Sequence, residues 1–291
     1  GADLGDARLW KADLRGAALS RANLAGATLS DSNLEGARLD GANLRGARMS
    51  SVNLRGADLS RADLEGAYLN EADLTGASLE RAVLKSAEAL SARFVSANLR
   101  YAKLDFVNVK GDRYGRRADF AGANLGEAML RQAQLEHANL QGADMTRADF
   151  TGARLEKANA RKAKALRAVF TEARLPGADF QEAELNETRF QGADLSSADL
   201  QFAQLNRANL SGANLAGAML NKAVLVEADL GGADLSDAHA YSTNFRGAHL
   251  AGANFRNASP FRAIVDLRWK EYLKTQKLGS DKMFGSIVWA Q

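Results

Sequence analysis

Ala57-Asp58-Leu59-Ser60-Arg61 is followed by Ala62-Asp63-Leu64-Glu65-Gly66, so the pattern Ala-Asp-Leu-x-x recurs every five residues. We number each pentad from its central Leu at position 0, which places Ala at −2 and Asp at −1. Centres keep this spacing from Leu4 to Val109, which is 22 repeats, and from Phe120 to Phe255, which is 28. Ala occupies −2 in 45 of these 50 repeats. A repeat this long decides the fold.

A period of five fits neither regular element. In an α-helix, positions five apart drift around the axis and form no apolar face. In a strand, successive Leu residues would point to opposite faces. Because −2 and 0 are apolar and the other positions are polar, each pentad has to turn the chain, which predicts a polygonal β-solenoid. The alternative, a helical array, is disfavoured by frequent Gly at +2, at about 1 kcal/mol each. These glycines are Gly16, Gly26, Gly36, Gly46, Gly56, Gly66 and Gly76.

The tandem pentads resemble the pentapeptide-repeat family over about residues 2–258. The resemblance implies an all-β fold, a right-handed quadrilateral β-helix with four pentads per coil and with Leu, Phe and Ala pointing inward. The −1 residues also favour four pentads per coil. If residues twenty apart stack at the strand spacing of about 4.8 Å, Asn interleaved with Asp reduces the repulsion between stacked carboxylates. Two such columns are Asp3-Asn23-Asn43-Asp63 and Asp194-Asn214-Asp234-Asn254. We also expect Phe150, Phe170 and Phe190 to form one internal aromatic stack.

The repeats predict two regions. Residues 1–259 are expected to form the solenoid, interrupted by a short loop at 110–117, and residues 260–291 a C-terminal helical cap and tail. Ser259 and Pro260 are a suitable N-cap and first residue for a helix, and Gly279 is a plausible end. The apolar residues at helical spacing are Phe261, Val265, Trp269, Tyr272 and Leu273. Because an open solenoid end exposes strand edges, the uncapped N-terminal end is expected to continue or to meet a second chain as a homodimer.

Composition excludes several classes of function. The chain has no Cys, which rules out disulfides and Cys-based zinc sites. No stretch of about 18 apolar residues is present, so no membrane-spanning helix is expected. The net charge is +3 over 291 residues, and residues 2–110 hold 15 basic and 14 acidic side chains. These features do not identify a compartment, and the cytoplasm is our working expectation.

The largest break in the rhythm lies between Val109 and Phe120, which are eleven residues apart instead of a multiple of five. One or six residues are therefore inserted within Lys110–Arg117. A loop that leaves a regular scaffold is a common place for a binding determinant, and basic residues interleaved with aromatic ones suit a protein or phosphate-bearing partner. The alternative is an accommodated insertion with ordinary surface residues. The candidate partner-binding residues are Arg100, Tyr101, Lys103, Phe106, Arg113, Tyr114, Arg116 and Arg117.

A softer break occurs where a pentad centre is only Ala, at Ala89, Ala160 and Ala165. A Leu follows the short centre in both regions, as Leu90 and Leu166. One hypothesis is a local bulge that swings this Leu inward. The other is a coil that narrows and bends.

Nothing in the repeats predicts catalysis, which needs a concave site with converging polar groups. His137, His239 and His249 all occupy outward positions, and His239 and His249 lie two pentads apart on opposite sides of a four-sided coil. The aligned carboxylates of Asp179 and Asp199 could hold a cation weakly or hydrogen-bond their own turns. We expect no enzyme activity, cofactor, metal or small-molecule substrate.

The sequence therefore predicts a non-catalytic protein–protein interaction scaffold, with an unidentified protein as its partner. The family resemblance implies an alternative, a DNA-mimicking protein that binds gyrase or topoisomerase IV and confers resistance to topoisomerase poisons. Such mimicry needs a strongly negative surface, whereas this chain is nearly neutral and its +2 column of Arg21, Arg61 and Arg81 is basic. Direct binding of nucleic acid by the basic loop is a third possibility, and we do not expect nucleic acid as the partner.

Overall fold

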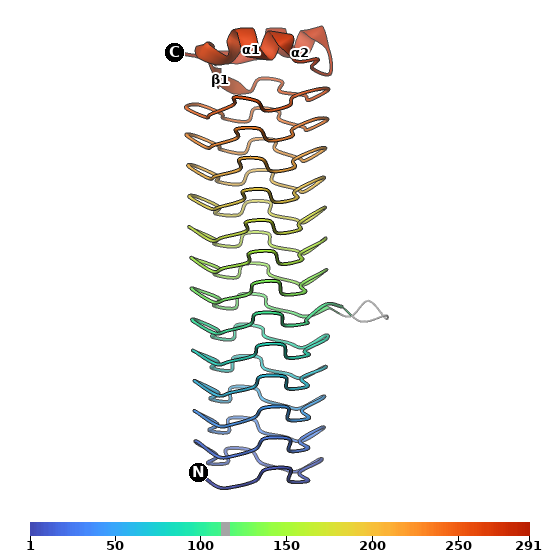
Figure 1. Ribbon diagram of the computed structural model, residues 1–291, viewed down its shortest axis with the longest axis vertical. Helices are drawn as coiled ribbons and strands as arrows, with labels where there is room; N and C mark the ends of the chain where they lie inside the picture. Colours follow the sequence, from blue (N-terminus) through green and yellow to red (C-terminus); the bar gives the residue numbers. More distant parts are fainter. Residues whose placement is uncertain (112–116) are drawn as a thin grey trace. The chain divides into compact units, whose positions relative to one another are not determined.

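The computed structural model describes residues 1–111 and 117–291. They form two compact units, Gly1–Arg154 and Leu155–Gln291. Within each unit the chain winds through coils that lie one above another (Figure 1). The division falls inside the repeats, and the predicted junction at 259/260 lies within the second unit.

The coils are joined by isolated parallel β-bridges between −1 residues twenty apart, such as Asn23 with Asn43 and Asp194 with Asn214. Two backbone hydrogen bonds accompany each β-bridge between adjacent coils. The Leu24 N–H donates to the Asn43 carbonyl at 2.7 Å, and the Asn43 N–H donates to the Ala22 carbonyl at 2.9 Å. Each coil therefore holds four pentads, and the chain is a β-helix held by short parallel ladders.

Each pentad ends in a four-residue turn whose third residue, at +2, has a positive φ. In one example the Ala27 N–H donates to the Leu24 carbonyl at 3.0 Å, and Gly26 has φ +66°. Gly at +2 suits this conformation, but other residues share it, including Arg61 at φ +58° and Tyr101 at φ +61°. A side chain in this left-handed region costs roughly 1–2 kcal/mol. The turn therefore favours Gly, and a larger +2 residue is not required by the fold.

Leu or Phe at 0 and Ala at −2 fill the interior, where Leu24, Ala27 and their equivalents are completely buried. The predicted stack of Phe170 on Phe190 is confirmed, with ring centroids 4.9 Å apart. Phe150 lies in the first unit. A second stack, Phe94 on Phe120 at 4.6 Å, was not predicted because the inserted residues separate its members by 26 positions.

The insertion adds six residues, which decides between the two alternatives. Across it, β-bridges join residues 26 apart instead of twenty, such as Arg93 with Asp119 and Lys103 with Met129. The coils on both sides keep their register.

The predicted inward bulge at the small centres is wrong. Ala89, Ala160 and Ala165 are buried at regular centre positions, whereas Leu90 is half-buried and Leu166 is 39% exposed. The Ala160 N–H still donates to the Asp179 carbonyl at 2.7 Å, so the ladder is unbroken. In the next coil the same column holds Phe180, whose larger ring lies beside the small centre.

The predicted Asn and Asp columns are confirmed as ladders of side-chain hydrogen bonds. The Asn23 amide donates to Asp3 at 2.8 Å, and the Asn43 amide donates to Asn23 at 3.1 Å. In the second unit the Asn254 amide donates to Asp234 at 2.9 Å. An amide between two carboxylates replaces a repulsion with a charge-assisted hydrogen bond.

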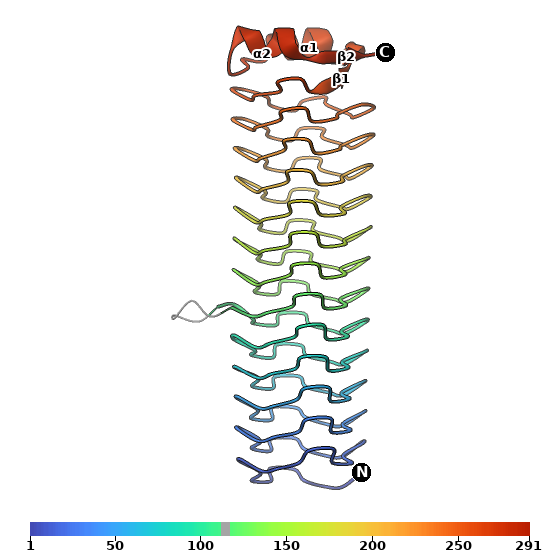
Figure 2. The same ribbon diagram turned by 180° about the vertical axis from the view of Figure 1, so that it is seen from behind.

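The C-terminal segment contains five short elements. They are the strand β1 (Ile264–Asp266), the 3₁₀ helix η1 (Leu267–Trp269), the helices α1 (Lys270–Thr275) and α2 (Asp281–Ser286), and the strand β2 (Val288–Ala290). β1 and β2 pair in parallel, with Val265 opposite Trp289. Figure 2 shows the two strands together beside the helices. No helix among residues 1–111 and 117–291 is long and apolar enough to cross a membrane.

The prediction of a helix starting at Pro260 is wrong, because the repeat continues for two more pentads. Pro260 and Val265 occupy buried centres, Ser259 bridges to His239 and Ile264 bridges to Asn244. Helix α1 begins only at Lys270. In other coils the N–H of the centre residue donates to the following coil. Pro has no N–H, but no coil follows Pro260, so its place in the last coil costs little hydrogen bonding.

The residues after the last coil satisfy the four −2 carbonyls that a further coil would have bound. Gly279 N–H donates to Ala258 at 3.0 Å and Val288 N–H donates to Ala263 at 2.8 Å. The other two bonds come from side chains, Trp269 Nε1 to Ala248 at 3.0 Å and Tyr272 Oη to Ala253 at 2.6 Å. Buried carbonyls need such partners, so this segment closes the open strand edge.

Candidate functional site

The predicted partner-binding residues lie at different places around the coil. Arg100 and Tyr101 form one turn, Lys103 lies on the strand that follows, and Phe106 lies at the next turn. Lys110 and the loop begin two pentads after the Tyr101 turn, which is half of a twenty-residue coil. The structure therefore brings the first four residues onto one side and places the start of the loop on the other.

The loop residues are only partly described. Arg117 is exposed where the chain rejoins the coil. Arg113, Tyr114 and Arg116 lie outside the described residues. The side that carries Tyr101 is therefore the part of the predicted site whose geometry can be analysed.

We define the Tyr101 face as this side of three successive coils, with the two turns and the strand between them. Its further members are Asp105 and residues that lie twenty positions before or 26 positions after Arg100, Tyr101, Lys103 and Asp105. Sequence reasoning missed them, although the twenty-residue period combined with a six-residue insertion would have found them. The added members are Glu80, Arg81, Val83, Lys85, Asp105, Glu127, Met129 and Arg131.

Tyr101 lies between two guanidinium groups. The Cζ atom of Arg100 is 4.8 Å from the ring centroid and that of Arg81 is 5.2 Å away. Both distances suit cation–π attraction, which contributes about 0.5–1 kcal/mol at exposed sites. The two arginines therefore hold a half-buried aromatic ring upright on a polar surface.

Phe106 is the second aromatic residue of the Tyr101 face, and its side chain is 47% exposed. Its φ is +61°, in the left-handed region where the turn favours Gly. The turn therefore does not require a phenyl ring at this position. An exposed ring that the fold does not require is a candidate contact for a partner.

The three acidic residues of the Tyr101 face are all engaged with arginines. Glu127 accepts from Arg100 at 3.2 Å, and this hydrogen bond raises the pKa of Arg100. Asp105 is buried and accepts from Arg131 Nε and Nη2, each at 2.9 Å, which raises the pKa of Arg131. Glu80 lies 3.7 Å from Arg81.

The Tyr101 face keeps a positive excess after these pairings. It holds five basic residues, Arg81, Lys85, Arg100, Lys103 and Arg131, against three acidic ones, an excess of two. Lys85 and Lys103 are exposed, and neither makes an ion pair within residues 1–111 and 117–291. The surface thus combines an exposed Phe106 ring and a half-buried Tyr101 ring with uncompensated cations.

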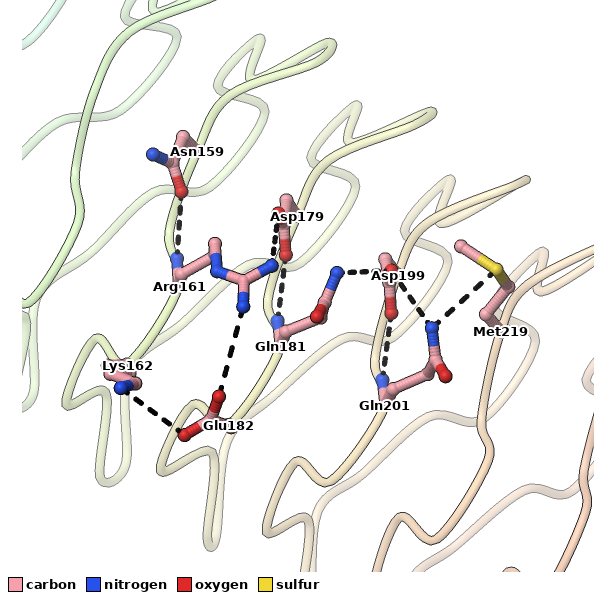
Figure 3. Close-up of polar contacts among 9 residues, drawn as sticks. All are labelled: Asn159, Arg161, Lys162, Asp179, Gln181, Glu182, Asp199, Gln201 and Met219. Carbon is pink, nitrogen blue, oxygen red and sulfur yellow. Dashed lines mark hydrogen bonds and ion pairs between the residues drawn. The ribbon is translucent and has the colours of Figure 1, made fainter.

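In the second unit, Asp179 and Asp199 belong to a polar ladder on one side of the coils (Figure 3). Each carboxylate accepts from the backbone N–H two residues later, Gln181 and Gln201 respectively, at 3.0 Å. The second oxygen of Asp199 accepts from the Gln181 amide at 2.5 Å, and that of Asp179 accepts from Arg161 at 3.4 Å. The carboxylates therefore support turns, as one of the two alternatives predicted.

The described residues offer no arrangement for metal binding. Within 1–111 and 117–291, no group of three His, Asp or Glu side chains could hold an ion. His137, His239 and His249 are exposed, as predicted. His249 lies 5.9 Å from the ring of Trp269.

Comparison with protein families gives two matches. A model for pentapeptide repeats matches in eight copies, over residues 1–36, 29–66, 62–100, 116–152 and 241–259. A model for a pentapeptide repeat region matches residues 143–220. No curated protein matches the chain.

Three solved structures illustrate the similarity. HetL, a pentapeptide repeat protein involved in heterocyst differentiation regulation from the cyanobacterium Nostoc sp. strain PCC 7120, is 31% identical over 82% of this chain and 89% of its own, with a TM-score of 0.33. Trypsin-treated QnrB1, a plasmid-mediated fluoroquinolone resistance protein, is 19% identical over 64% and 89%, with a TM-score of 0.41. A pentapeptide repeat protein from the Arabidopsis thaliana thylakoid lumen is 28% identical over 46% and 76%, with a TM-score of 0.22.

Proposed function

Since this chain belongs to the pentapeptide repeat family, we propose that it is a non-catalytic scaffold that binds another protein through the Tyr101 face. Its interior is filled by Leu, Phe and Ala side chains, so function has to come from the outer surface. The observation that carries the proposal is the exposed pairing of Tyr101 with Arg81 and Arg100 beside Phe106.

Aromatic and Arg side chains dominate the energetics of protein interfaces. Arg81 and Arg100 limit the motion of Tyr101, so less side-chain entropy is lost when a partner docks. The excess of two positive charges favours a partner with an acidic surface and attracts it during diffusion. We therefore propose an acidic protein surface with an apolar recess that receives Tyr101 and Phe106.

The finer geometry of the scaffold is part of the proposal. The twenty-residue register supports a coil with four sides, and the family resemblance supports a right-handed winding. We also propose that the part of residues 260–291 that follows the last coil functions as cap and tail, because hydrogen bonds from Trp269, Tyr272, Gly279 and Val288 close that coil. The loop at 110–117 is proposed as a second contact on the opposite side of the coil.

The charge balance supports the scaffold over a DNA mimic. Residues 1–111 and 117–154 carry 19 basic and 19 acidic side chains, and residues 155–291 carry 17 and 15. Duplex DNA carries about one negative charge per 1.7 Å of its axis. A competitor for a DNA-binding surface needs a comparable negative field, which a neutral surface lacks.

Site-specific photo-cross-linking in cells tests the proposal. A benzophenone amino acid replaces Lys103 in one full-length variant and Arg93 in a matched control. Both residues are exposed −1 residues, ten positions apart on opposite sides of the helix. We expect position 103 to capture one discrete protein, and position 93 to capture little of it.

Each outcome has a clear meaning. Capture from position 93 alone would overturn the Tyr101 face and assign binding to the side nearer the loop. Capture of a gyrase or topoisomerase IV subunit would favour the DNA mimic. No capture from either position, with both variants folded by circular dichroism, would overturn the scaffold proposal for this surface.

A further inference from the structure

The second unit carries an aromatic patch at turns of its last coils, in the column of turns that holds Lys162 and Glu182 of the polar ladder in Figure 3. We define the aromatic patch as Phe202, Lys222, Tyr241, Phe261 and Arg262. Phe202 is 46% exposed, and Tyr241 and Phe261 are each 38% exposed. All five residues occupy +1 or +2 positions of turns twenty residues apart, so they follow one another along the unit.

The members of the aromatic patch contact one another. Tyr241 and Phe261 stack with centroids 5.6 Å apart and planes 10° apart. Lys222 Nζ lies 5.2 Å from the Phe202 ring, and Arg262 Cζ lies 5.7 Å from the Phe261 ring. The rings are thus ordered by stacking and by cations while each stays more than one third exposed.

The neighbouring polar ladder provides a contrast within the same unit. There, Arg161 pairs with Asp179 at 3.4 Å and with Glu182 at 3.8 Å, and Lys162 pairs with Glu182 at 3.5 Å. The Gln201 amide reaches Met219 Sδ at 3.8 Å, and the ladder continues through Asn221, which donates to Gln201 at 3.5 Å and accepts from the Tyr241 N–H at 3.0 Å. Beyond Met219 the ladder contains no further carboxylate, and the exposed rings and cations of the aromatic patch lie beside it.

The two cations of the aromatic patch have no carboxylate partner. Residues 219–222, 239–242 and 259–262 contain no Asp or Glu, and Asp199, in the coil of Phe202, accepts hydrogen bonds from Gln181 and Gln201 instead. Lys222 and Arg262 make no ion pair within residues 155–291. A ligand for the aromatic patch therefore needs negative charge as well as apolar surface.

The spacing of the two cations restricts the ligand further. Lys222 and Arg262 lie two coils apart in one column, which is about 9.6 Å at the usual strand separation of about 4.8 Å. A polyproline II segment returns to the same side every three residues, a rise of about 9.3 Å. Carboxylates on every third residue would therefore meet both cations, while intervening prolines lie against the aromatic rings.

We propose that the aromatic patch is a second docking surface, which binds an acidic proline-rich segment of a partner protein in the polyproline II conformation. Such segments bind shallow aromatic surfaces with little loss of entropy because their conformation is preformed. Single-stranded nucleic acid fits less well. Base stacking needs free ring faces, and each of the three rings already has a cation or another ring as a neighbour. This proposal is independent of the Tyr101 face.

Fluorescence anisotropy with the full-length chain tests it. The probe is a fluorescein-labelled peptide with four Glu-Pro-Pro repeats. The comparison peptides have four Gln-Pro-Pro repeats, which removes the charge, and six Glu-Pro repeats, which changes the spacing to two residues. We expect the first peptide to bind at least tenfold more tightly than either of the others.

Charge reversal tests the location. The double variant Lys222→Glu/Arg262→Glu is expected to lose binding of the Glu-Pro-Pro peptide at least tenfold and to gain binding of a Lys-Pro-Pro peptide. The matched control Arg21→Glu/Arg61→Glu reverses two exposed +2 cations with the same spacing of 40 residues, outside both proposed binding surfaces, and is expected to leave Kd within twofold. Circular dichroism confirms that both variants are folded.

Several results would overturn the proposal. Equal affinity for the Glu-Pro-Pro and Gln-Pro-Pro peptides would remove the role of charge, and equal affinity for Glu-Pro repeats would remove the spacing. Unchanged binding in the double variant would place the peptide elsewhere. Tighter binding of a labelled oligo-dT, lost in the double variant, would assign the aromatic patch to nucleic acid.

Discussion

Replacing Phe190 with Ala tests whether the pentad register correctly separates core from surface. Phe190 is a centre residue, is completely buried and stacks on Phe170 at 4.9 Å. It also meets Phe180 edge-on at 6.5 Å. Truncation of a buried Phe costs about 3–5 kcal/mol, because the lost transfer free energy is joined by the cost of a cavity. We expect about 4 kcal/mol for Phe190→Ala.

Phe202→Ala is the matched control, since it removes the same side chain from the same unit at a +2 position. Phe202 is 46% exposed, so about half of the roughly 2–3 kcal/mol available from burying a Phe is lost. No cavity forms, and the expected cost is about 1 kcal/mol. Ala keeps the positive φ of this turn, so backbone strain does not differ between the parent and the variant.

Equilibrium urea unfolding, followed by far-ultraviolet circular dichroism, measures both changes. Repeat arrays can lose two-state behaviour, so the slope with denaturant has to be the same for the parent and the variants. A cost for Phe202→Ala equal to that for Phe190→Ala would refute the assignment of centre and +2 positions. A loss below about 1 kcal/mol for Phe190→Ala would refute the close packing of the aromatic stack.

Three further predictions follow from single contacts. Because Tyr101 has φ +61°, Tyr101→Gly should be more stable to urea than Tyr101→Ala by up to about 1 kcal/mol, and the reverse order would contradict the turn geometry. The hydrogen bond from Arg167 lowers the pKa of Glu187, so this carboxylate stabilises the fold above its ordinary pKa and stops doing so as pH falls through the lowered value. Glu187→Gln should accordingly weaken the dependence of stability on pH below about pH 5, and an unchanged pH profile of urea midpoints would count against the ion pair. Tyr272→Phe leaves the Ala253 carbonyl without its 2.6 Å donor and should cost about 1–3 kcal/mol of unfolding free energy, whereas a neutral result would show that water replaces the hydroxyl.

The five-residue period predicted most of the fold because one rule governs every coil. Leu or Phe at 0 and Ala at −2 are buried as expected, and Asn23 bonds to Asp3 twenty residues away. The prediction was wrong where a local sequence pattern indicated a helix inside the repeats. Ser259-Pro260 has the sequence of a helix start, but the preceding coils impose two further pentads and delay α1 to Lys270.

The candidate site was predictable in part. Tyr101 and Phe106 stand out because aromatic residues at +2 have to point outward. Arg81 follows from the twenty-residue period alone, whereas the place of Arg131 depends on the number of inserted residues, which the sequence left at one or six. The spacing of 26 between bridged residues decides this number and brings Arg131 against Asp105. The aromatic patch was missed because Phe202, Tyr241 and Phe261 are scattered along the chain and meet only through the twenty-residue coil.

The most direct test of the central claim is the cross-linking yield from position 103 in the full-length chain, with and without Tyr101→Gly. Gly suits the positive φ at this turn, so the change removes the aromatic ring and its two cation contacts while preserving the fold. The account predicts at least a tenfold fall in the yield of the captured protein, with the circular dichroism spectrum unchanged. An undiminished yield from a folded Tyr101→Gly variant would contradict the claim that the Tyr101 face binds the partner.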